Sequence, residues 1–211
     1  MEDDLARLPS ARDRLLRAAD GLFYTEGIHS VGVDRVTAES GVAKATLYQQ
    51  FRSKDELVAA CLQRRAEHWR RTVAGPVRAM SGSASRRVGA VFGRLGEAIA
   101  APGYRGCPFI NAAAEYPGPD GPVAAAIAAH RAQVRGLFAE LLAGFPAGRR
   151  AALTDQLVLL YDGTMVAGQL DQGPRAARRA QAAARQLLEE RSPAPAPAQS
   201  PSSVTGERTQ R

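Results

Sequence analysis

Features that are scarce in this 211-residue sequence exclude several classes of protein. Only two cysteines are present, Cys61 and Cys107, which is too few for the disulfide framework of a small secreted domain. No apolar run is long enough to cross a bilayer, and the acidic start of the chain lacks a signal-peptide pattern. We therefore expect a cytoplasmic protein with reduced thiols.

Signatures of catalysis are also missing. The sequence contains no HExxH, GxSxG or P-loop motif, and its three histidines, His29, His68 and His130, lack metal-ligand spacing. No segment shows the sustained alternation of β-branched residues that is typical of a strand. The sequence therefore predicts an all-α protein that is not an enzyme and needs no metal or cofactor.

Lysine is scarce as well. Among 28 Lys and Arg residues, only Lys44 and Lys54 are lysines, and a compact ammonium at just these places suggests contacts with phosphate. Residues 1–60 carry 8 basic and 10 acidic side chains, whereas residues 61–95 carry 8 and 1. We interpret the basic residues of 61–95 as a solvated helix surface, with a contact to nucleic acid in addition to that of the two lysines as the alternative.

Apolar periodicity and capping residues predict about nine helices. Ser10 and Ser53 each precede an acidic residue by three positions, as in a capping box, and Gly75-Pro76 is expected to break or kink the fourth helix. Residues 192–211, rich in Pro, Ala and Ser, are expected to be disordered. The predicted helices span about 10–26, 33–40, 44–51, 53–75, 83–101, 107–115, 122–143, 148–171 and 174–190.

The region from Val31 to Leu57 has the pattern of a helix-turn-helix. Two short helices are joined by a tight turn at Ser40-Gly41, and in this motif the second helix enters the major groove of DNA. Leu47 and Phe51, four positions apart, are expected to anchor that helix in the core.

This region resembles the N-terminal domain of TetR-type transcriptional regulators. The resemblance rests on AAxxLFxxxG at 18–27, on Val36 and on GVAKATLYQQFxSKxxL at 41–57, and GCPFIN at 106–111 is similar to a segment in a subgroup of these regulators. It implies a homodimer with an N-terminal helix-turn-helix domain of three helices and a larger helical domain for ligand binding and dimerisation. The implied boundaries are 1–60, 61–191 and a tail at 192–211.

The family further implies a ligand-responsive regulator that binds a palindromic operator, usually to repress, and is released by a small-molecule effector. A transcriptional activator and a redox-responsive regulator remain as alternatives. By position, Lys44 and Lys54 would bind phosphate, Tyr48 would lie against the sugar-phosphate backbone, and the glutamines could read adenine. The implied DNA-contacting residues are Lys44, Ala45, Thr46, Tyr48, Gln49, Gln50 and Lys54.

Two further sites are expected in the larger domain. A mostly apolar pocket would suit a hydrophobic or amphipathic effector, although His130 could instead be a core residue with one hydrogen bond. Its candidate residues are Trp69, Phe92, Phe109, Asn111, Tyr116, His130, Tyr161 and Met165. The last two helices would form the dimer interface, with packing inside one chain as the alternative. The candidate interface residues are Leu157, Leu160, Thr164, Gly168, Ala180, Ala184 and Leu187.

Cys107 carries a separate hypothesis. It precedes Pro108 at the start of a short helix, where amide dipoles can lower the pKa of a thiol and make it a redox sensor. The alternative is that Cys107 is a small buried hydrophobic residue.

Overall fold

The computed structural model describes residues 9–171 and 173–189, and these contain ten α-helices, one π-helical segment and no strand. The all-α prediction is confirmed, whereas the predicted tail at 192–211 lies outside the described residues. The helices are α1 (Ala11–Glu26), α2 (Val33–Ser40), α3 (Lys44–Gln50), α4 (Lys54–Trp69), η1 (Arg70–Ala74), α5 (Gly75–Ala79), α6 (Ala84–Ala100), α7 (Pro108–Glu115), α8 (Gly121–Leu141), α9 (Ala147–Leu170) and α10 (Arg175–Glu189).

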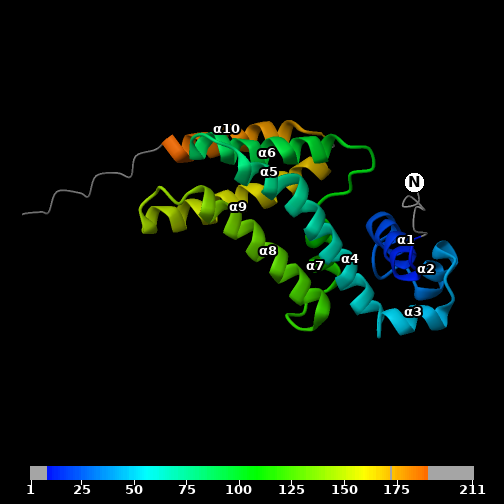
Figure 1. Cartoon of the computed structure of the whole chain (residues 1–211). Helices are drawn as coiled ribbons and strands as arrows, with labels where there is room; N and C mark the ends of the chain where they lie inside the picture. The colour runs from blue at the N-terminus through cyan, green and yellow to red at the C-terminus, as the bar shows by residue number, and fades with distance from the viewer. Residues whose placement is uncertain (1–8, 172, 190–211) are drawn as a thin grey trace, which may run out of the picture.

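The first three helices cluster at one end of the molecule, against the start of α4 (Figure 1). Leu15 of α1, Leu47 of α3 and Leu57 of α4 are fully buried there. Ser10 caps α1 as predicted, because its Oγ accepts a hydrogen bond from the Asp13 N–H over 3.1 Å. The small core holds three short helices that would be unstable in isolation.

The turn between α2 and α3 depends on glycine. Gly41 has a φ of +63°, in the left-handed region, and the Val42 N–H donates to the Thr37 carbonyl over 3.3 Å. A residue with a Cβ would be strained in this conformation. The turn therefore sets the angle at which α3 leaves α2.

Helix α4 joins this cluster to the rest of the molecule. Ser53 caps it by accepting from the Glu56 N–H over 3.1 Å, as predicted. The predicted break at Gly75-Pro76 is wrong, because the chain stays helical through the π-helical segment η1 into α5 and ends at Ala79, although the helix type changes at Gly75. Pro76 lacks an N–H, and the wider π turn before it accommodates that missing donor.

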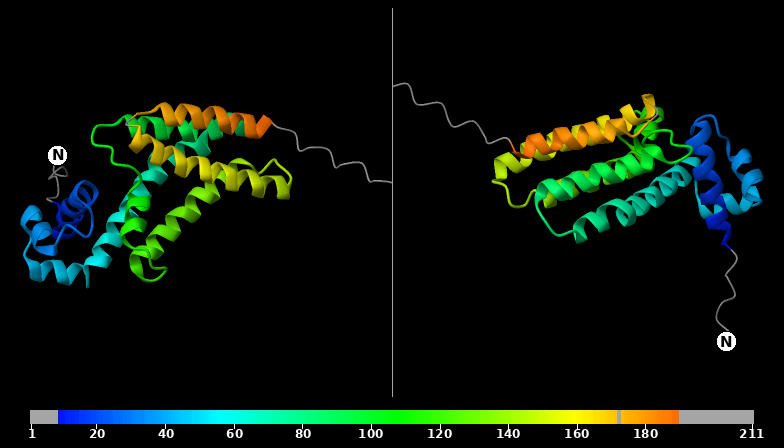
Figure 2. Two further views of the ribbon diagram at one scale, coloured as in Figure 1. Left: turned by 180° about the vertical axis from the view of Figure 1, so that it is seen from behind. Right: turned by 90° about the horizontal axis from the view of Figure 1, so that it is seen from above.

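The larger part of the molecule is built from α4 to α10. Helices α6 and α10 run side by side and α9 packs against both, while α8 runs along α4 (Figures 1 and 2). Its core includes the fully buried rings of Phe92 and Phe138, with centroids 6.2 Å apart. Within the described ranges, no helix is both long enough and apolar enough to cross a membrane.

Candidate functional site

Helix α3 presents one buried and one open face. Leu47 lies in the core and Phe51, directly after the helix, is also buried, so the predicted anchors are confirmed. On the opposite side, the Tyr48 ring is 47% exposed, which is unusual for a large aromatic side chain without a partner. The predicted DNA-contacting residues are exposed at Lys44, Ala45, Tyr48, Gln49 and Gln50 and half-buried at Thr46 and Lys54.

The two lysines have different surroundings. Nζ of Lys44 lies 2.7 Å from a carboxylate oxygen of Asp34, and this hydrogen bond raises the pKa of Lys44. Lys54, at the start of α4, lies over the ring of Phe23 with Nζ 5.9 Å from its centroid. Both ammonium groups therefore flank α3, but Lys44 must leave Asp34 before it can pair with a phosphate.

The structure adds a cation that the sequence pattern did not indicate. The Arg12 guanidinium lies 4.4 Å from the centroid of the Phe51 ring, and its Nη1 donates to the Gln50 carbonyl over 3.3 Å. This arrangement places a positive charge at the C-terminal end of α3. Arg12 is 38 residues from Gln50, so no local spacing rule could have found it.

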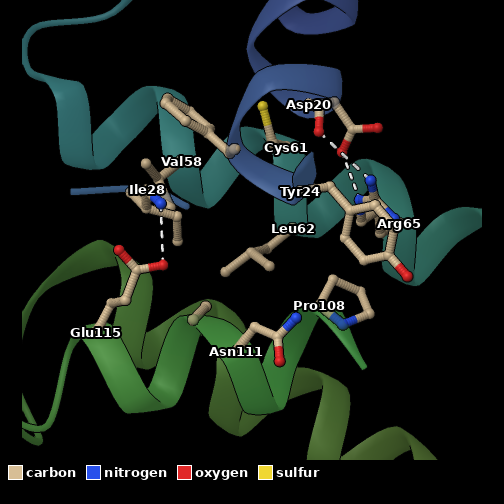
Figure 3. Close-up of a pocket in the computed structure, with 12 residues that line it drawn as sticks. Asp20, Tyr24, Ile28, Val58, Cys61, Leu62, Arg65, Pro108, Asn111 and Glu115 are labelled. Carbon is tan, nitrogen blue, oxygen red and sulfur yellow. Dashed lines mark hydrogen bonds and ion pairs between the residues drawn. The ribbon is translucent and has the colours of Figure 1, made fainter. Parts of the chain in front are cut away.

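Three parts of the chain meet where the N-terminal cluster adjoins the larger part of the molecule. They are α1 with residues 28–29, α4, and α7 with the loop 101–107, and we call the place where they meet the junction. The Glu115 carboxylate, at the end of α7, accepts a hydrogen bond from the Ile28 N–H over 2.9 Å (Figure 3). It also accepts one from the His29 N–H over 2.6 Å. Burial alone would raise the pKa of Glu115, but these bonds and the His29 ring lower it.

Two tyrosines complete the junction. The Tyr24 hydroxyl on α1 donates to the Gly106 carbonyl over 2.9 Å and accepts from the Arg105 N–H over 2.8 Å. The Tyr116 hydroxyl donates to Asp55 of α4 over 2.8 Å. The segments on either side of the junction are thus tied by hydrogen bonds between residues far apart in the sequence.

An ion pair crosses the same region between α1 and α4. Nε of Arg65 donates to the Asp20 carboxylate over 2.5 Å, and the guanidinium lies 4.2 Å from the centroid of the Tyr24 ring (Figure 3). The hollow beside these residues measures only about 30 Å³, so the junction is packed rather than open.

Next to the junction lies a cavity of about 370 Å³, which we call the central cavity. It is bounded by α4, η1, α6, α7, α8, α9 and the loop 101–107, and its size is within the range of small-molecule sites. Five of the eight predicted effector residues line it, and they are Trp69, Phe109, His130, Tyr161 and Met165.

The other three predicted residues lie elsewhere. Phe92 is fully buried against Phe138. Asn111 donates from Nδ2 to the Arg105 carbonyl over 2.9 Å and faces the junction (Figure 3). Tyr116 is held by Asp55 and stacks on His29 with ring centroids 5.2 Å apart. These side chains maintain the walls and the junction rather than the cavity surface.

Two residues that line the central cavity each have a buried nitrogen atom without a hydrogen-bond partner, Nε1 of Trp69 and Nδ1 of His130. The two side chains are only 8% and 5% exposed. The Trp69 indole lies near the Tyr161 hydroxyl without reaching hydrogen-bond geometry. Burial lowers the pKa of His130 to about 4, so this imidazole is uncharged at neutral pH. The prediction of one satisfied hydrogen bond is therefore not met at Nδ1.

Cys107 differs from the redox hypothesis in its electrostatics. The side chain is buried, and burial raises the pKa of the thiol although the N–H groups of Ile110 and Phe109 act to lower it. A lowered pKa at this cysteine was therefore a wrong expectation, because loss of hydration outweighs the amide dipoles. The geometry favours the alternative of a small buried hydrophobic residue.

The outer faces of α9 and α10 form a groove of about 660 Å³. Of the predicted interface residues, Leu160, Thr164, Ala180 and Leu187 line it. Leu157, Gly168 and Ala184 instead face inward and are covered within the chain, because α9 and α10 turn these positions toward α6 and α8. On the outer face, Leu159 and Leu170 are 68% and 76% exposed, and the spacing argument missed both.

Family profiles match two stretches of the chain. The profile described as bacterial regulatory proteins of the tetR family matches residues 15–61, and that of the tetracyclin repressor-like C-terminal domain matches residues 84–184. A TetR-family transcriptional regulator from Streptomyces coelicolor is 42% identical, with a TM-score of 0.77 over 84% of this chain and 94% of that one.

Two other relatives add narrower information. The HTH-type transcriptional activator FasR of Mycolicibacterium smegmatis is 44% identical over 64 residues, which is 29% of this chain and 29% of that protein. The regulatory protein TetR of Rhodobacter sphaeroides is 21% identical, with a TM-score of 0.71 over 84% of this chain and 98% of that one, and shares the fold.

Proposed function

This chain belongs to the TetR family of bacterial regulatory proteins and is a DNA-binding transcriptional regulator, and we propose that it represses transcription as a homodimer released from a palindromic operator by a small-molecule effector. In this proposal residues 1–60 bind DNA and residues 61–191 bind the effector and the second subunit. The protein acts in the cytoplasm, where the operator is accessible. All the proposed activities are binding events, and none of them needs catalysis.

The proposed DNA-binding surface is the open face of α3. Its glutamines, Gln49 and Gln50, can read base edges, and Tyr48 can lie on the sugar-phosphate backbone. Lys44 and Lys54 flank these residues and would neutralise phosphates. Arg12 is a further candidate for a phosphate contact, because it lies at the end of α3 next to Gln50.

The proposed dimer interface is the outer face of α9 and α10. Leu159 and Leu170 form an exposed apolar surface beside the groove, and surfaces of this kind mark interaction sites. A two-fold contact would pair this face with the same face of a second copy. This two-fold contact would place the α3 helices of the two subunits at the distance that separates successive major grooves of DNA.

One observation carries the proposed release by an effector: the loop 101–107 and α7 line the central cavity and also hold the N-terminal cluster. Gly106 and Cys107 are cavity residues, and the Gly106 carbonyl accepts from Tyr24 of α1. Glu115, at the other end of α7, holds residues 28 and 29. An effector that moves α7 would therefore change the orientation of α3, and operator DNA would weaken effector binding by the same factor.

A second candidate is activation of transcription, and the activator among the relatives favours it. Repression and activation use the same residues and differ in where the operator lies relative to the promoter. Transcription from the bound promoter, measured with and without the protein, separates them.

The test of the proposed function is selection of genomic DNA fragments by the full-length protein, followed by titration of enriched fragments at several salt concentrations. We expect an inverted repeat with a steep salt dependence. Lys54→Ala should reduce the slope of log affinity against log salt by about one per half-site. Arg94→Ala, which removes an exposed cation of α6, is the matched control. Binding of all fragments alike would contradict a specific operator.

A further inference from the structure

The central cavity differs from ordinary protein interior in the state of its polar groups. Two of its hydroxyl groups have partners: the Tyr104 hydroxyl donates to the Met165 carbonyl over 2.9 Å, and the Thr72 hydroxyl donates to the His68 carbonyl over 2.9 Å. The Nε1 atom of Trp69 and the Nδ1 atom of His130 have none. Leaving a buried polar atom unpaired is costly, so two such atoms on residues that line one cavity indicate a bound group that pairs with at least one of them.

The walls define the shape of that group. The rings of His130 and Phe109 are stacked, with centroids 3.7 Å apart and planes 12° apart, and Trp69 meets His130 edge-on at 5.2 Å. His130 and Phe109 also line a smaller hollow of about 140 Å³, so they form the wall between two spaces. A flat aromatic molecule can stack on such a wall.

The charges in the cavity lining argue against an ionic ligand. The lining contains no Asp or Glu to balance a cation. Its one arginine, Arg65, is paired with Asp20 and lies over the Tyr24 ring, so an anion would have to compete with both. His130 is uncharged at neutral pH because burial lowers its pKa. A charged ligand would lose part of its hydration here, and the lining holds no carboxylate for a cation and no unpaired arginine for an anion.

We propose that the central cavity binds a flat, uncharged aromatic effector that carries a hydrogen-bond acceptor such as a ketone oxygen. The acceptor pairs with Nε1–H of Trp69, and the ring system packs against the His130–Phe109 wall. This assignment rests on the proposed function, since it takes the cavity as the effector site. An indole N–H can only donate, and therefore Trp69 requires an acceptor rather than a second donor.

Four probes built on one naphthalene skeleton test this assignment in the full-length protein without DNA: 2-acetylnaphthalene, 2-ethylnaphthalene, 2-naphthoate and a naphthylmethyl trimethylammonium ion. Trp69 is the only tryptophan of the chain, so quenching of its fluorescence reports on the cavity itself. Calorimetry supplies the dissociation constants. We expect the ketone to bind about tenfold more tightly than the hydrocarbon, and both ions to bind more weakly.

Variants separate the hydrogen bond from the shape of the cavity. Trp69→Phe keeps a ring but removes the N–H, and calorimetry should show equal binding of the ketone and the hydrocarbon. Thr72→Val is the matched control, because its hydroxyl already has a partner, and it should preserve the tenfold difference. If Trp69→Phe does not fold, the comparison of ketone and hydrocarbon in the unmodified protein still tests the hydrogen bond, and His130→Phe, which keeps the ring on Phe109 and the N–H of Trp69, should preserve the tenfold difference.

Several outcomes would overturn the assignment: tightest binding of the carboxylate or the ammonium ion, equal binding of ketone and hydrocarbon by the unmodified protein, or no binding of any probe. The proposed regulatory function is tested by DNA binding instead. It is contradicted if no specific operator is found, or if the operator complex persists at a saturating concentration of a ketone that the cavity binds. Because the cavity assay contains no DNA, the two failures are distinguishable.

Discussion

At the scale of single residues, Asp34 forms an ion pair with Lys44, the residue proposed to contact phosphate. The carboxylate holds the ammonium group at 2.7 Å and also adds negative charge close to the proposed phosphate contact. Lysine and aspartate on this surface are both accessible to solvent, so the pair can exchange for a phosphate at small cost. If Lys44 binds phosphate as proposed, Asp34 weakens DNA binding while it pairs with Lys44 in the free protein.

Asp34→Asn should strengthen operator binding roughly two- to fivefold at low salt, because Lys44 is released and a repulsive charge is removed. Fluorescence anisotropy with a labelled operator measures the change. Asp120→Asn, an equal change of charge in the exposed residue before α8, should have little effect. Unchanged or weaker binding by the Asp34 variant would show that Lys44 does not contact phosphate.

Glu115 gives the junction a defined dependence on pH. Its hydrogen bonds lower the pKa of the carboxyl below the ordinary value of 4.5, so its stabilising contribution is complete above that pH. The contribution is lost as the pH falls through the lower pKa of the folded protein. Glu115→Gln should therefore reduce the melting temperature by a few degrees at pH 7, and the difference should disappear in acid.

Thermal unfolding of the protein and of Glu115→Gln between pH 3 and 8 measures this effect. Glu97→Gln is the matched control, because Glu97 is exposed on α6 and its ion pair with Arg94 is at the surface. A difference between Glu115→Gln and the unmodified protein that does not narrow as the pH falls below 4.5 would contradict the role assigned to the carboxylate charge.

At the scale of helices, Gly168 allows α9 to approach α6. A Cβ added at this position would lie 2.6 Å from Cδ1 and 2.9 Å from Cγ1 of Ile99, closer than two carbon atoms can pack. Gly168 was expected at a dimer interface, but the close contact explains why glycine occurs here inside one chain. The small residue serves packing between two helices of the same molecule.

Gly168→Ala should lower the free energy of unfolding by about 1–3 kcal/mol, because the buried Ile99 side chain must shift. Chemical denaturation measures this change in the free energy of unfolding. Gly136→Ala on α8 is the matched control, since nothing lies within 4 Å of its added Cβ, and it should raise the free energy of unfolding slightly through helix propensity. Equal effects of the two variants would contradict the close packing of α9 on α6.

At the scale of the whole molecule, the proposed homodimer links the exposed leucines of α9 to the proposed DNA-binding surface. Leu159→Asp places a charge on the proposed interface without disturbing the core, because Leu159 is 68% exposed. We expect sedimentation to show a monomer, and operator affinity to fall about a hundredfold as the two half-sites lose their linkage.

Ala132→Asp, at an exposed alanine of α8, should leave both the mass and the DNA affinity unchanged. A Leu159→Asp variant that remains dimeric would move the interface away from the α9–α10 groove. A monomeric variant with full operator affinity would instead remove the need for a dimer.

Local patterns predicted much of the fold. Ser10 and Ser53 cap α1 and α4 through the bonds that their spacing implies, and Leu47 and Phe51 are buried. These features depend on residues three or four positions apart, which a helix brings together by its own geometry. The break predicted at Gly75-Pro76 does not occur, because η1 and α5 pack against α4 and α6 and keep the chain helical although Pro76 lacks an N–H.

The sequence by itself determined the helices, the helix-turn-helix with its two flanking lysines, and the family to which the chain belongs. Only the tertiary structure decided that Glu115 binds residues 28 and 29, that Tyr24 binds Gly106 and that Trp69 and His130 share one cavity. These contacts join residues about 60 to 90 positions apart. Their partners follow from how whole helices pack, which no local pattern contains.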